Sequence, residues 1–470
     1  MPLHQEKKMI SKNPSTGEIL FEGKEATLKE VDEAFKNAKE AFLDWSNLSL
    51  ETRYHYLTRF QDSLIRNKER LSQTISSETG KMLRESEQEV DAMAAKIPIS
   101  WDAYNTRCPT KEKSVPLGKS VTRHHPHGVC GVLGPYNFPG HLPNGHIIPA
   151  LLAGNTVVFK PSEFTPLTAI EMINCWKEVD LPKGVINLVL GGKQVGERIV
   201  QSPELNALFF TGSAKTGLIL SNYFGNHPEK ILALEGGGNN PLIVSKIHDL
   251  KAAAYIAIQS AFITTGQRCS CTRRLIVVNN DPFIETLLSL SKTIEVGTFM
   301  GPLIHEEAAL NFIKSQEELI AKGGIPLLKG EHLKKNTGFV SCSIIDMTKV
   351  NERPDEEIFG PLLQIIRVNS LHEAITIANS TSYGLACGIL SDDIKEYEQV
   401  LRKGRAGIIN WNTPTTGALS SNPFGGIGIS GNGHPSAYYA ADYCSYPVAS
   451  VESEVIKPPS KVLPGIQYHA

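Results

Sequence analysis

Two cysteines that could act as nucleophiles, Cys269 and Cys271, lie close together in the stretch FITTGQRCSC. A cysteine thiolate adds readily to a carbonyl carbon and later departs as a good leaving group. Without further motifs, the usual state of a cysteine is a small, inert, buried side chain. Catalysis can be assigned to one of these thiols only if other parts of the chain supply its partners.

Three glycine-rich segments are candidates for holding a phosphate-containing ligand. The segment GSAKTG (212–217) follows the apolar run ALFF and opens a helical stretch, whose free N-terminal amides would attract a pyrophosphate. It is not a P-loop, because Leu218 and Ile219 stand where Lys and Ser or Thr are required, and a plain strand-to-helix turn explains it equally well. The segment EGGGNN (235–240) also follows a strand and permits close backbone approach. The segment GIGISG (426–431) lacks a strand before it and a helix after it, so we exclude it as a dinucleotide loop.

Alternating strands and helices are predicted to position these segments. In the first third of the chain, apolar residues recur at spacings of three and four, which predicts a helix with one buried face: Leu28, Val31, Phe35, Ala38 and Phe42. From Gly128 onward, apolar runs such as NTVVFK and ALFFTGS alternate with segments of helix length. This pattern is typical of an α/β fold with right-handed crossovers and a mostly parallel sheet. A second α/β unit is expected from near Gly238, and in it the two thiols directly follow a helix.

Composition and charge exclude several classes of function. The chain has 470 residues, and 47 Lys and Arg face 49 Asp and Glu, so it lacks the basic field that nucleic acid or an anionic membrane surface requires. The start, MPLHQEKKMISKN, has no apolar stretch of a signal peptide, and no apolar run reaches about 18 residues. The eight cysteines are sparse, so we expect free thiols in a reducing cytoplasm.

Histidines cluster in RHHPHG and GHLPNGH, which raises the alternative of a metal site. No H-E-x-x-H motif or Cys/His ligand spacing accompanies them. We therefore expect no metal, and we expect the group 124–127 on a surface hairpin.

Seven short motifs occur along the chain in this order: GPYNFP, FKPSE, FTGS, LEGGG, GQRC, EEIFGP and NPFGG. By the identity, order and spacing of these motifs, the chain resembles the NAD(P)-dependent aldehyde dehydrogenase superfamily from about Asn13 to its C-terminal region. The resemblance implies a Rossmann-like NAD-binding domain from residues 1–110 and 128–237 and an α/β catalytic domain from 238–428. It further implies an oligomerisation element from 111–127 and 429–470, and hence a homodimer or homotetramer.

Longer stretches, among them YNFPGHLPNGHIIPALLAGN, LEGGGNNP and GQRCSCTRRL, look like the N-succinylglutamate 5-semialdehyde dehydrogenases of arginine catabolism. The substrate implied is N-succinyl-L-glutamate 5-semialdehyde, oxidised to N-succinyl-L-glutamate with NAD and water. The alternatives are another semialdehyde or a general aliphatic aldehyde. A cysteine hydrolase or transferase without a redox step is a further alternative, but no nearby motif supplies the histidine base it would need.

By the same resemblance, three residues carry the chemistry. Cys269 is the nucleophile, and the side-chain amide of Asn137 with the backbone amide of Cys269 stabilises the oxyanion. Glu235 is the general base that activates water against the thioester. Relatives that transfer the acyl group to coenzyme A do not use such a base, so Glu235 favours a free acid product.

The resemblance also implies the cofactor contacts. Lys160 and Glu163 would meet the adenosine ribose, where a carboxylate accepts two hydroxyls but repels a 2′-phosphate, which favours NAD over NADP. The pyrophosphate would lie at the helix start formed by Gly212, Ser213, Ala214, Lys215, Thr216 and Gly217. Glu357 and Phe359 would position the nicotinamide ribose.

A substrate with two carboxylates needs cationic or amide partners, because a desolvated carboxylate without them is costly. Arg268 beside the nucleophile is one candidate, and the pair Arg273 and Arg274 is another, although a structural role suits that pair better. The loop NTPTTGALSSNPFGG (412–426) offers small polar side chains for the mouth of the substrate tunnel.

Overall fold

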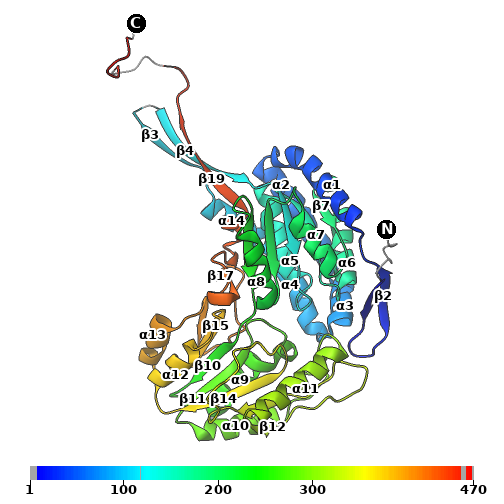
Figure 1. The fold of residues 1–470 in the computed structure, drawn as a ribbon, viewed down its shortest axis with the longest axis vertical. Coiled ribbons are helices and arrows are strands. Elements are labelled where there is room, and N and C mark those ends of the chain that lie inside the picture. Colours follow the sequence, from blue (N-terminus) through cyan, green and yellow to red (C-terminus); the bar gives the residue numbers. More distant parts are fainter. Residues whose placement is uncertain (1–7, 117, 457–461, 468–470) are drawn as a thin grey trace.

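The computed structural model describes residues 8–116, 118–456 and 462–467, and it places two α/β bodies end to end along the long axis of the molecule (Figure 1). The first body contains a five-stranded sheet in the order β7-β6-β5-β8-β9, in which every neighbouring pair is parallel. This confirms the parallel sheet predicted from the alternating pattern. Its strands are β5 (Val129–Leu133), β6 (Thr156–Lys160), β7 (Ile186–Leu188), β8 (Ala207–Thr211) and β9 (Ile231–Glu235).

Helices cover both faces of this sheet because its strands send alternate apolar side chains into two clusters. Cys130 and Val132 of β5 pack in the cluster of α2 to α6, while Val129 and Leu133 pack with α1, α7 and α8. Continuous apolar strands are expected when both faces are buried. The helices are α1 (Leu28–Ser46), α2 (Leu50–Arg66), α3 (Lys68–Thr79), α4 (Leu83–Arg107), α5 (His141–Ala153), α6 (Pro166–Lys177), α7 (Lys193–Gln201) and α8 (Ala214–Phe224).

Helix α1 contains the buried face that the spacing of apolar residues predicted. Its N-terminus is fixed by a capping box, in which Thr27 and Glu30 bond each other's backbone amides, and Val31, Phe35 and Ala38 are buried as predicted. Leu28, the first residue of the helix, is exposed instead of buried. Phe42 near the other end of the helix is half-buried, so the predicted face is confirmed in the middle of the helix and not at its start.

The second body contains a seven-stranded sheet in the order β12-β13-β14-β11-β10-β15-β16, parallel except for the edge strand β12. Helices α9 and α10 cover one face, and α11, α12 and α13 cover the other. The strands are β10 (Asn240–Val244), β11 (Thr272–Val278), β12 (Ile325–Leu328), β13 (Ser343–Asp346), β14 (Leu362–Val368), β15 (Ala386–Leu390) and β16 (Ile408–Trp411). The helices are α9 (Leu250–Phe262), η1 (Ile263–Gly266), α10 (Asp281–Ser291), α11 (Glu306–Ala321), α12 (Leu371–Asn379) and α13 (Ile394–Lys403).

A three-stranded antiparallel arm projects from the first body (Figure 1). It joins β3 (Lys111–Val115) and β4 (Gly118–Pro126) to the C-terminal strand β19 (Ser445–Glu452), with the histidine group at the end of β4. The arm contains the hairpin expected for oligomerisation, but the domain boundaries and the oligomeric state stay predictions. The remaining elements are β1 (Lys8–Lys12), β2 (Ile19–Lys24), β17 (Pro423–Phe424), η2 (Gly428–Ser430), β18 (Ser436–Ala437) and α14 (Ala440–Tyr443).

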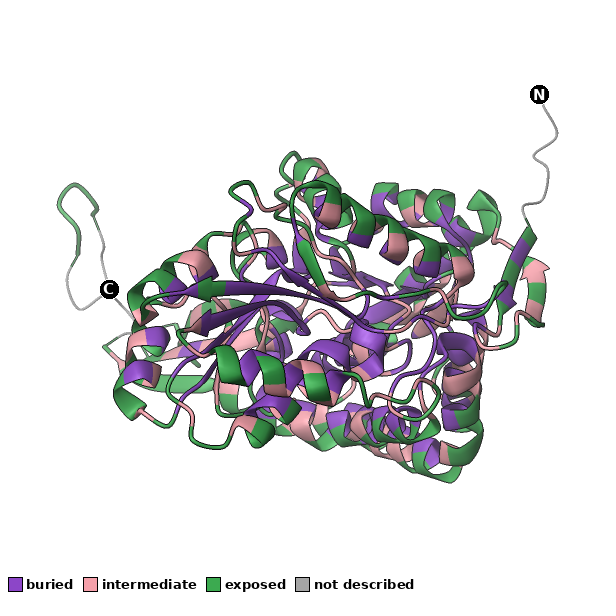
Figure 2. Ribbon diagram, turned by 90° about the horizontal axis from the view of Figure 1, so that it is seen from below, coloured by how far each residue is buried: buried purple, intermediate pink, exposed green. Residues whose placement is uncertain are grey.

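Burial follows this layering. Buried residues lie along the sheets and the inner faces of the helices, and exposed residues line the outer helix faces (Figure 2). All eight cysteines are free thiols, as expected. Within the described ranges, no helix has both the length and the apolar character needed to cross a membrane. In the same part of the chain, no cluster of three or more His, Cys, Asp or Glu side chains could hold a metal ion.

Candidate active site

The candidate base lies where the strands of the first sheet end. Glu235 is the last residue of β9, and the parallel register pairs it with Thr211, the last residue of β8. Side chains at paired positions project to the same face of a sheet, and the hydroxyl of Thr211 donates a hydrogen bond of 3.2 Å to Oε2 of Glu235. The carboxyl ends of parallel strands are the usual place for ligand sites in α/β sheets.

The candidate nucleophile follows a turn with an uncommon backbone. Thr264, Thr265 and Gly266 have φ values of 53°, 56° and 70°, so three consecutive residues occupy the left-handed region. This region is unfavourable for β-branched residues and costs about 1–3 kcal/mol for each of them. At the third position a side chain is excluded outright, because a Cβ on Gly266 would lie 2.2 Å from the carbonyl oxygen of Gly360. The two thiols thus follow helix α9, as predicted, and a turn that contains Gly266 separates them from it.

Hydrogen bonds from three directions hold this turn in place. The hydroxyl of Thr264 donates to Oε1 of Glu85 at 2.6 Å, and the hydroxyl of Thr265 donates to the carbonyl of Gly301 at 2.7 Å. Further along, the side-chain amide of Asn240 donates to the carbonyl of Cys269 at 2.6 Å. The surrounding structure therefore fixes the backbone on both sides of the nucleophile, which compensates for the cost of the turn.

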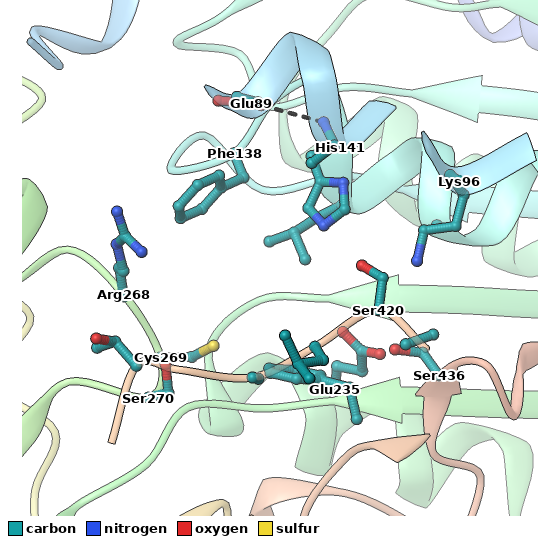
Figure 3. Close-up of a pocket in the computed structure, with 18 of the residues that line it drawn as sticks. Glu89, Lys96, Phe138, His141, Glu235, Arg268, Cys269, Ser270, Ser420 and Ser436 are labelled. Carbon is teal, nitrogen blue, oxygen red and sulfur yellow. Dashed lines mark hydrogen bonds between the residues drawn. The ribbon is translucent and has the colours of Figure 1, made fainter. Parts of the chain in front are cut away.

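Cys269 and Glu235 line one cavity of about 260 Å³ between the two bodies (Figure 3). A single water needs only about 10–15 Å³, so the cavity accommodates a substrate of several carbon atoms. The sulfur of Cys269 points into this space from the second body, and Glu235 lies on the first. Ser420 and other residues of the loop 412–426 also line this cavity.

Burial shifts the ionisation of both groups in the same direction. It raises the pKa of Glu235 to about 7, although the hydrogen bond from Thr211 and the ammonium of Lys96 lower it. It also raises the pKa of the Cys269 thiol, with Glu357 and Glu235 adding to the effect. The thiol therefore carries its proton at neutral pH, and a base with a pKa near 7 lies in the same cavity.

Asn137 lies beside the nucleophile loop. It is buried, and its side-chain amide donates a 3.0 Å hydrogen bond to the carbonyl of Gln267, two residues before Cys269. An asparagine amide carries two N–H groups, so one remains for an oxyanion. The structure thus brings the three predicted catalytic residues, Asn137, Glu235 and Cys269, to one site.

Cys271 occupies a different environment from Cys269. It is fully buried, its thiol faces the carbonyl of Ile263 at 3.8 Å, and it is not among the residues that line the cavity. Both residues precede β11, and the turn at 269–270 directs the two side chains differently. Of the two thiols, only Cys269 can meet a substrate in this cavity.

Lys160 and Glu163 lie at the end of β6, next to the other strand ends. The ammonium of Lys160 is buried and donates to the carbonyls of Pro161 and Gly191, both at 2.8 Å, and it lies 3.9 Å from the carboxylate of Glu163. Glu163 is half exposed. A partly neutralised, accessible carboxylate at this position suits ribose hydroxyls.

The segment 212–217 forms the strand-to-helix turn that its sequence predicted. Gly212 follows β8, Ser213 caps the helix by accepting a 3.3 Å hydrogen bond from the amide of Thr216, and α8 begins at Ala214. The amides of the first helical turn have no acceptor within the helix. They fit an anionic group of a dinucleotide.

Glu357 packs directly against the glycines that follow Glu235. Its Oε1 accepts a 3.1 Å hydrogen bond from the amide of Gly238, and a Cβ on Gly237 would lie 1.6 Å from its Oε2. Only glycine at this point lets the carboxylate approach. Burial raises the pKa of Glu357 to about 7, and the guanidinium of Arg273 lies 4.0 Å away and stacks on the ring of Phe359.

The three arginines considered for the substrate site differ in their contacts. Arg273 and Arg274 donate their hydrogen bonds to backbone carbonyls and are buried, which is a structural role. Arg268 lines the cavity but is paired with Glu85 at 3.3 Å and bonded to Thr264. No arginine of this group offers an uncommitted charge.

Sequence reasoning missed Lys96 on α4. Its side chain is 2% exposed, and the ammonium points into the cavity without a hydrogen bond or an ion pair to any described residue (Figure 3). The signal was present in the helix, because Lys96 shares a face with the buried residues Met93 and Ser100. A charged residue on the buried face of a helix indicates a partner or a ligand.

An aldehyde dehydrogenase family model matches residues 3–448. Three similar solved structures are the glyceraldehyde-3-phosphate dehydrogenase GapN of Methanocaldococcus jannaschii with NADP, a Thermus 1-pyrroline-5-carboxylate dehydrogenase with NAD, and the aldehyde dehydrogenase KauB of Pseudomonas aeruginosa. They are 30%, 28% and 29% identical, with TM-scores of 0.88, 0.90 and 0.89. The matches cover 95%, 95% and 94% of this chain and 99%, 90% and 93% of those chains.

The chain therefore belongs to the aldehyde dehydrogenase family and has its fold. It is an oxidoreductase of the NAD(P)-dependent class, and the likeness to one structure with NADP and another with NAD leaves both dinucleotides open.

The two thiols make a matched pair for mutation. We expect Cys269→Ala to abolish aldehyde-dependent formation of reduced cofactor, because no other thiol lines the cavity. Cys271→Ser should retain most of the activity, because its side chain faces the core. The check is the rate of NADH absorbance increase for both purified variants. A fully active Cys269→Ala variant, or equal losses from both, would contradict the assignment.

Proposed function

We propose that this protein oxidises N-succinyl-L-glutamate 5-semialdehyde to N-succinyl-L-glutamate with NAD and water. The observation that carries the proposal is the shared cavity of Cys269, Glu235 and the uncommitted cation Lys96. The first two residues supply the chemistry of an aldehyde dehydrogenase, and the third suits a substrate that carries a carboxylate. The subfamily motifs of the sequence point to the same substrate.

The reaction follows from the positions of these groups. The Cys269 thiol releases its proton to water and adds as the thiolate to the aldehyde carbon. The amide of Asn137 and the backbone amide of Cys269 stabilise the resulting oxyanion. The oxyanion collapses with loss of hydride and leaves a thioester on the sulfur. The bound dinucleotide supplies the hydride acceptor. Glu235 then takes a proton from water, the resulting hydroxide attacks the thioester, and the acid departs as the Cys269 thiolate is released.

The charges around the cavity support an acidic substrate. The carboxylate of Glu89 is paired with Lys81, and that of Glu85 is paired with Arg268. Within each pair the two charges neutralise each other. Lys96 is then left as a cation that can bind a substrate carboxylate. Hydroxyls of Ser420, Ser436 and other small side chains line the same space. A buried ammonium without a partner gains most from a ligand that supplies one.

The competing proposal is an NAD-dependent dehydrogenase for another semialdehyde or a general aliphatic aldehyde. Apolar residues such as Phe138 and Leu419 also line the cavity and would suit an uncharged chain. A homodimer or homotetramer assembled through the arm of β3, β4 and β19 is proposed with either function. The two substrate classes are separated by the contribution of Lys96.

We expect Lys96→Met to lower kcat/KM for N-succinylglutamate semialdehyde about 10- to 100-fold relative to kcat/KM for propanal, as for loss of one charge-assisted hydrogen bond of ~1.5–3 kcal/mol. The ratio of the two substrates is the measured quantity, because Lys96 also acts on Glu235 and any effect on the base cancels in it. Lys335→Met, at an exposed lysine, is the control for lost charge. Propanal reacting as well as the dicarboxylate in the unmodified enzyme would contradict the proposed substrate.

We propose NAD as the cofactor because Glu163, which the resemblance assigns to the adenosine ribose, carries a half-exposed carboxylate that would repel a 2′-phosphate. We expect Glu163→Gln to lower the ratio of kcat/KM for NAD to kcat/KM for NADP. Hydride transfer itself, seen as a rapid initial formation of NADH, should persist. Steady-state titrations with both dinucleotides measure the ratio. An unchanged ratio would place Glu163 away from the ribose.

A further inference from the structure

A chain of buried side chains ends on the candidate base. Oε2 of Glu235 accepts from the hydroxyl of Thr211 at 3.2 Å, Oγ1 of Thr211 lies 3.0 Å from Nε2 of His146, and Nδ1 of His146 lies 2.8 Å from the hydroxyl of Tyr443. All four side chains are buried, and they come from β9, β8, α5 and α14. The C-terminal segment is thereby linked to the centre of the site.

The direction of each hydrogen bond in this chain is determined. Thr211 has one hydroxyl proton and gives it to ionised Glu235, so it must accept from Nε2–H of His146. Burial lowers the pKa of His146 to about 3, so the ring is neutral and Nδ1 is an acceptor. The hydroxyl of Tyr443 then donates to Nδ1. Every link therefore points its proton toward the Glu235 carboxylate.

The second oxygen of the carboxylate is treated differently. Oε1 of Glu235 is buried and has no hydrogen-bond partner among the described residues. The residue itself lines the substrate cavity. One oxygen is thus held by the protein, and the other is left as the acceptor for a substrate or water proton.

We propose that Thr211, His146 and Tyr443 are positioning residues, which hold Glu235 by Oε2 as an anion and leave Oε1 to take the proton of the hydrolytic water. This inference rests on the proposed role of Glu235 as the base. In this series of hydrogen bonds, His146 stays neutral over the working pH range and does not act as a base. Its role is to donate from Nε2 to Thr211 and to accept at Nδ1 from Tyr443.

Other titratable groups face Glu235 and affect its ionisation. Lys96 from α4 lowers its pKa, and Cys269 and Tyr443 interact with it from the nucleophile loop and from α14. Cys269 and Tyr443 stay protonated near neutral pH because burial raises the pKa of each, so neither adds a charge there. Two further groups titrate near neutral pH: burial lowers the pKa of Lys96 to about 8, and it raises the pKa of Glu357, which acts on Cys269, to about 7. Of these groups, Glu235 is the one to which Thr211 donates, so a midpoint that shifts in a Thr211 variant reports on the Glu235 carboxylate.

The test is the pH dependence of thioester hydrolysis. In stopped-flow traces with saturating semialdehyde and NAD, the burst of NADH reports hydride transfer and the linear phase reports hydrolysis. A carboxylate is a base only above its pKa, so the linear rate should rise through about pH 7 in the unmodified enzyme. Thr211→Val removes the donor at nearly constant volume and should move this midpoint up by about one pH unit while the burst persists.

Three further variants make the result decisive. Thr211→Ser restores the hydroxyl and should return the midpoint, Tyr443→Phe should shift it upward by less, and exposed Thr376→Val on α12 should leave it unchanged. If Thr211→Val does not fold, Tyr443→Phe carries the test. A uniform loss of rate at every pH, with an unmoved midpoint, would overturn the inference. An unmodified enzyme whose hydrolysis shows no pH dependence would instead overturn the role of Glu235 itself.

Discussion

The burial of the Glu235 carboxylate at the end of β9 is the constraint on which the site depends. A carboxylate removed from water is costly unless donors and opposite charge replace its hydration. Thr211 supplies a donor because the register of two parallel strands places it alongside, and Lys96 supplies positive charge from α4. The replacement is partial, which leaves the pKa near 7 and makes the group useful as a base at neutral pH.

The same region joins the two bodies of the molecule. Glu235 ends the first sheet and Asn240 begins the second, so only four residues connect them. Gly236 and Gly237 in this link allow close approach by the backbone near Ser430 and by the carboxylate of Glu357. The candidate base at the end of one sheet and the candidate nucleophile just before a strand of the other therefore share one cavity. Fixing this link fixes their relative position.

Much of this arrangement could be predicted from the sequence, and its limits have physical causes. Apolar runs indicated the strands, and motifs separated Cys269 from Cys271, because both signals are local. Thr264 was not predicted in the left-handed region, since a β-branched residue disfavours that conformation and only the tertiary hydrogen bonds stabilise it. Lys96 and His146 were missed because their roles depend on residues distant in the sequence. Lys96 faces Glu235 in the cavity, and His146 on α5 contacts Thr211 and Tyr443. The histidines had been weighed only as metal ligands.

The most direct test of the account is chemical trapping on the Glu235→Gln variant. Glutamine keeps the shape of the side chain but cannot accept the proton of water, so the reaction should stop at the thioester. After mixing with N-succinylglutamate semialdehyde and NAD and quenching in acid, peptide mass spectrometry should find the acyl group on Cys269, with one equivalent of NADH formed per chain. Normal turnover without an adduct, or an adduct on Cys271, would contradict the account.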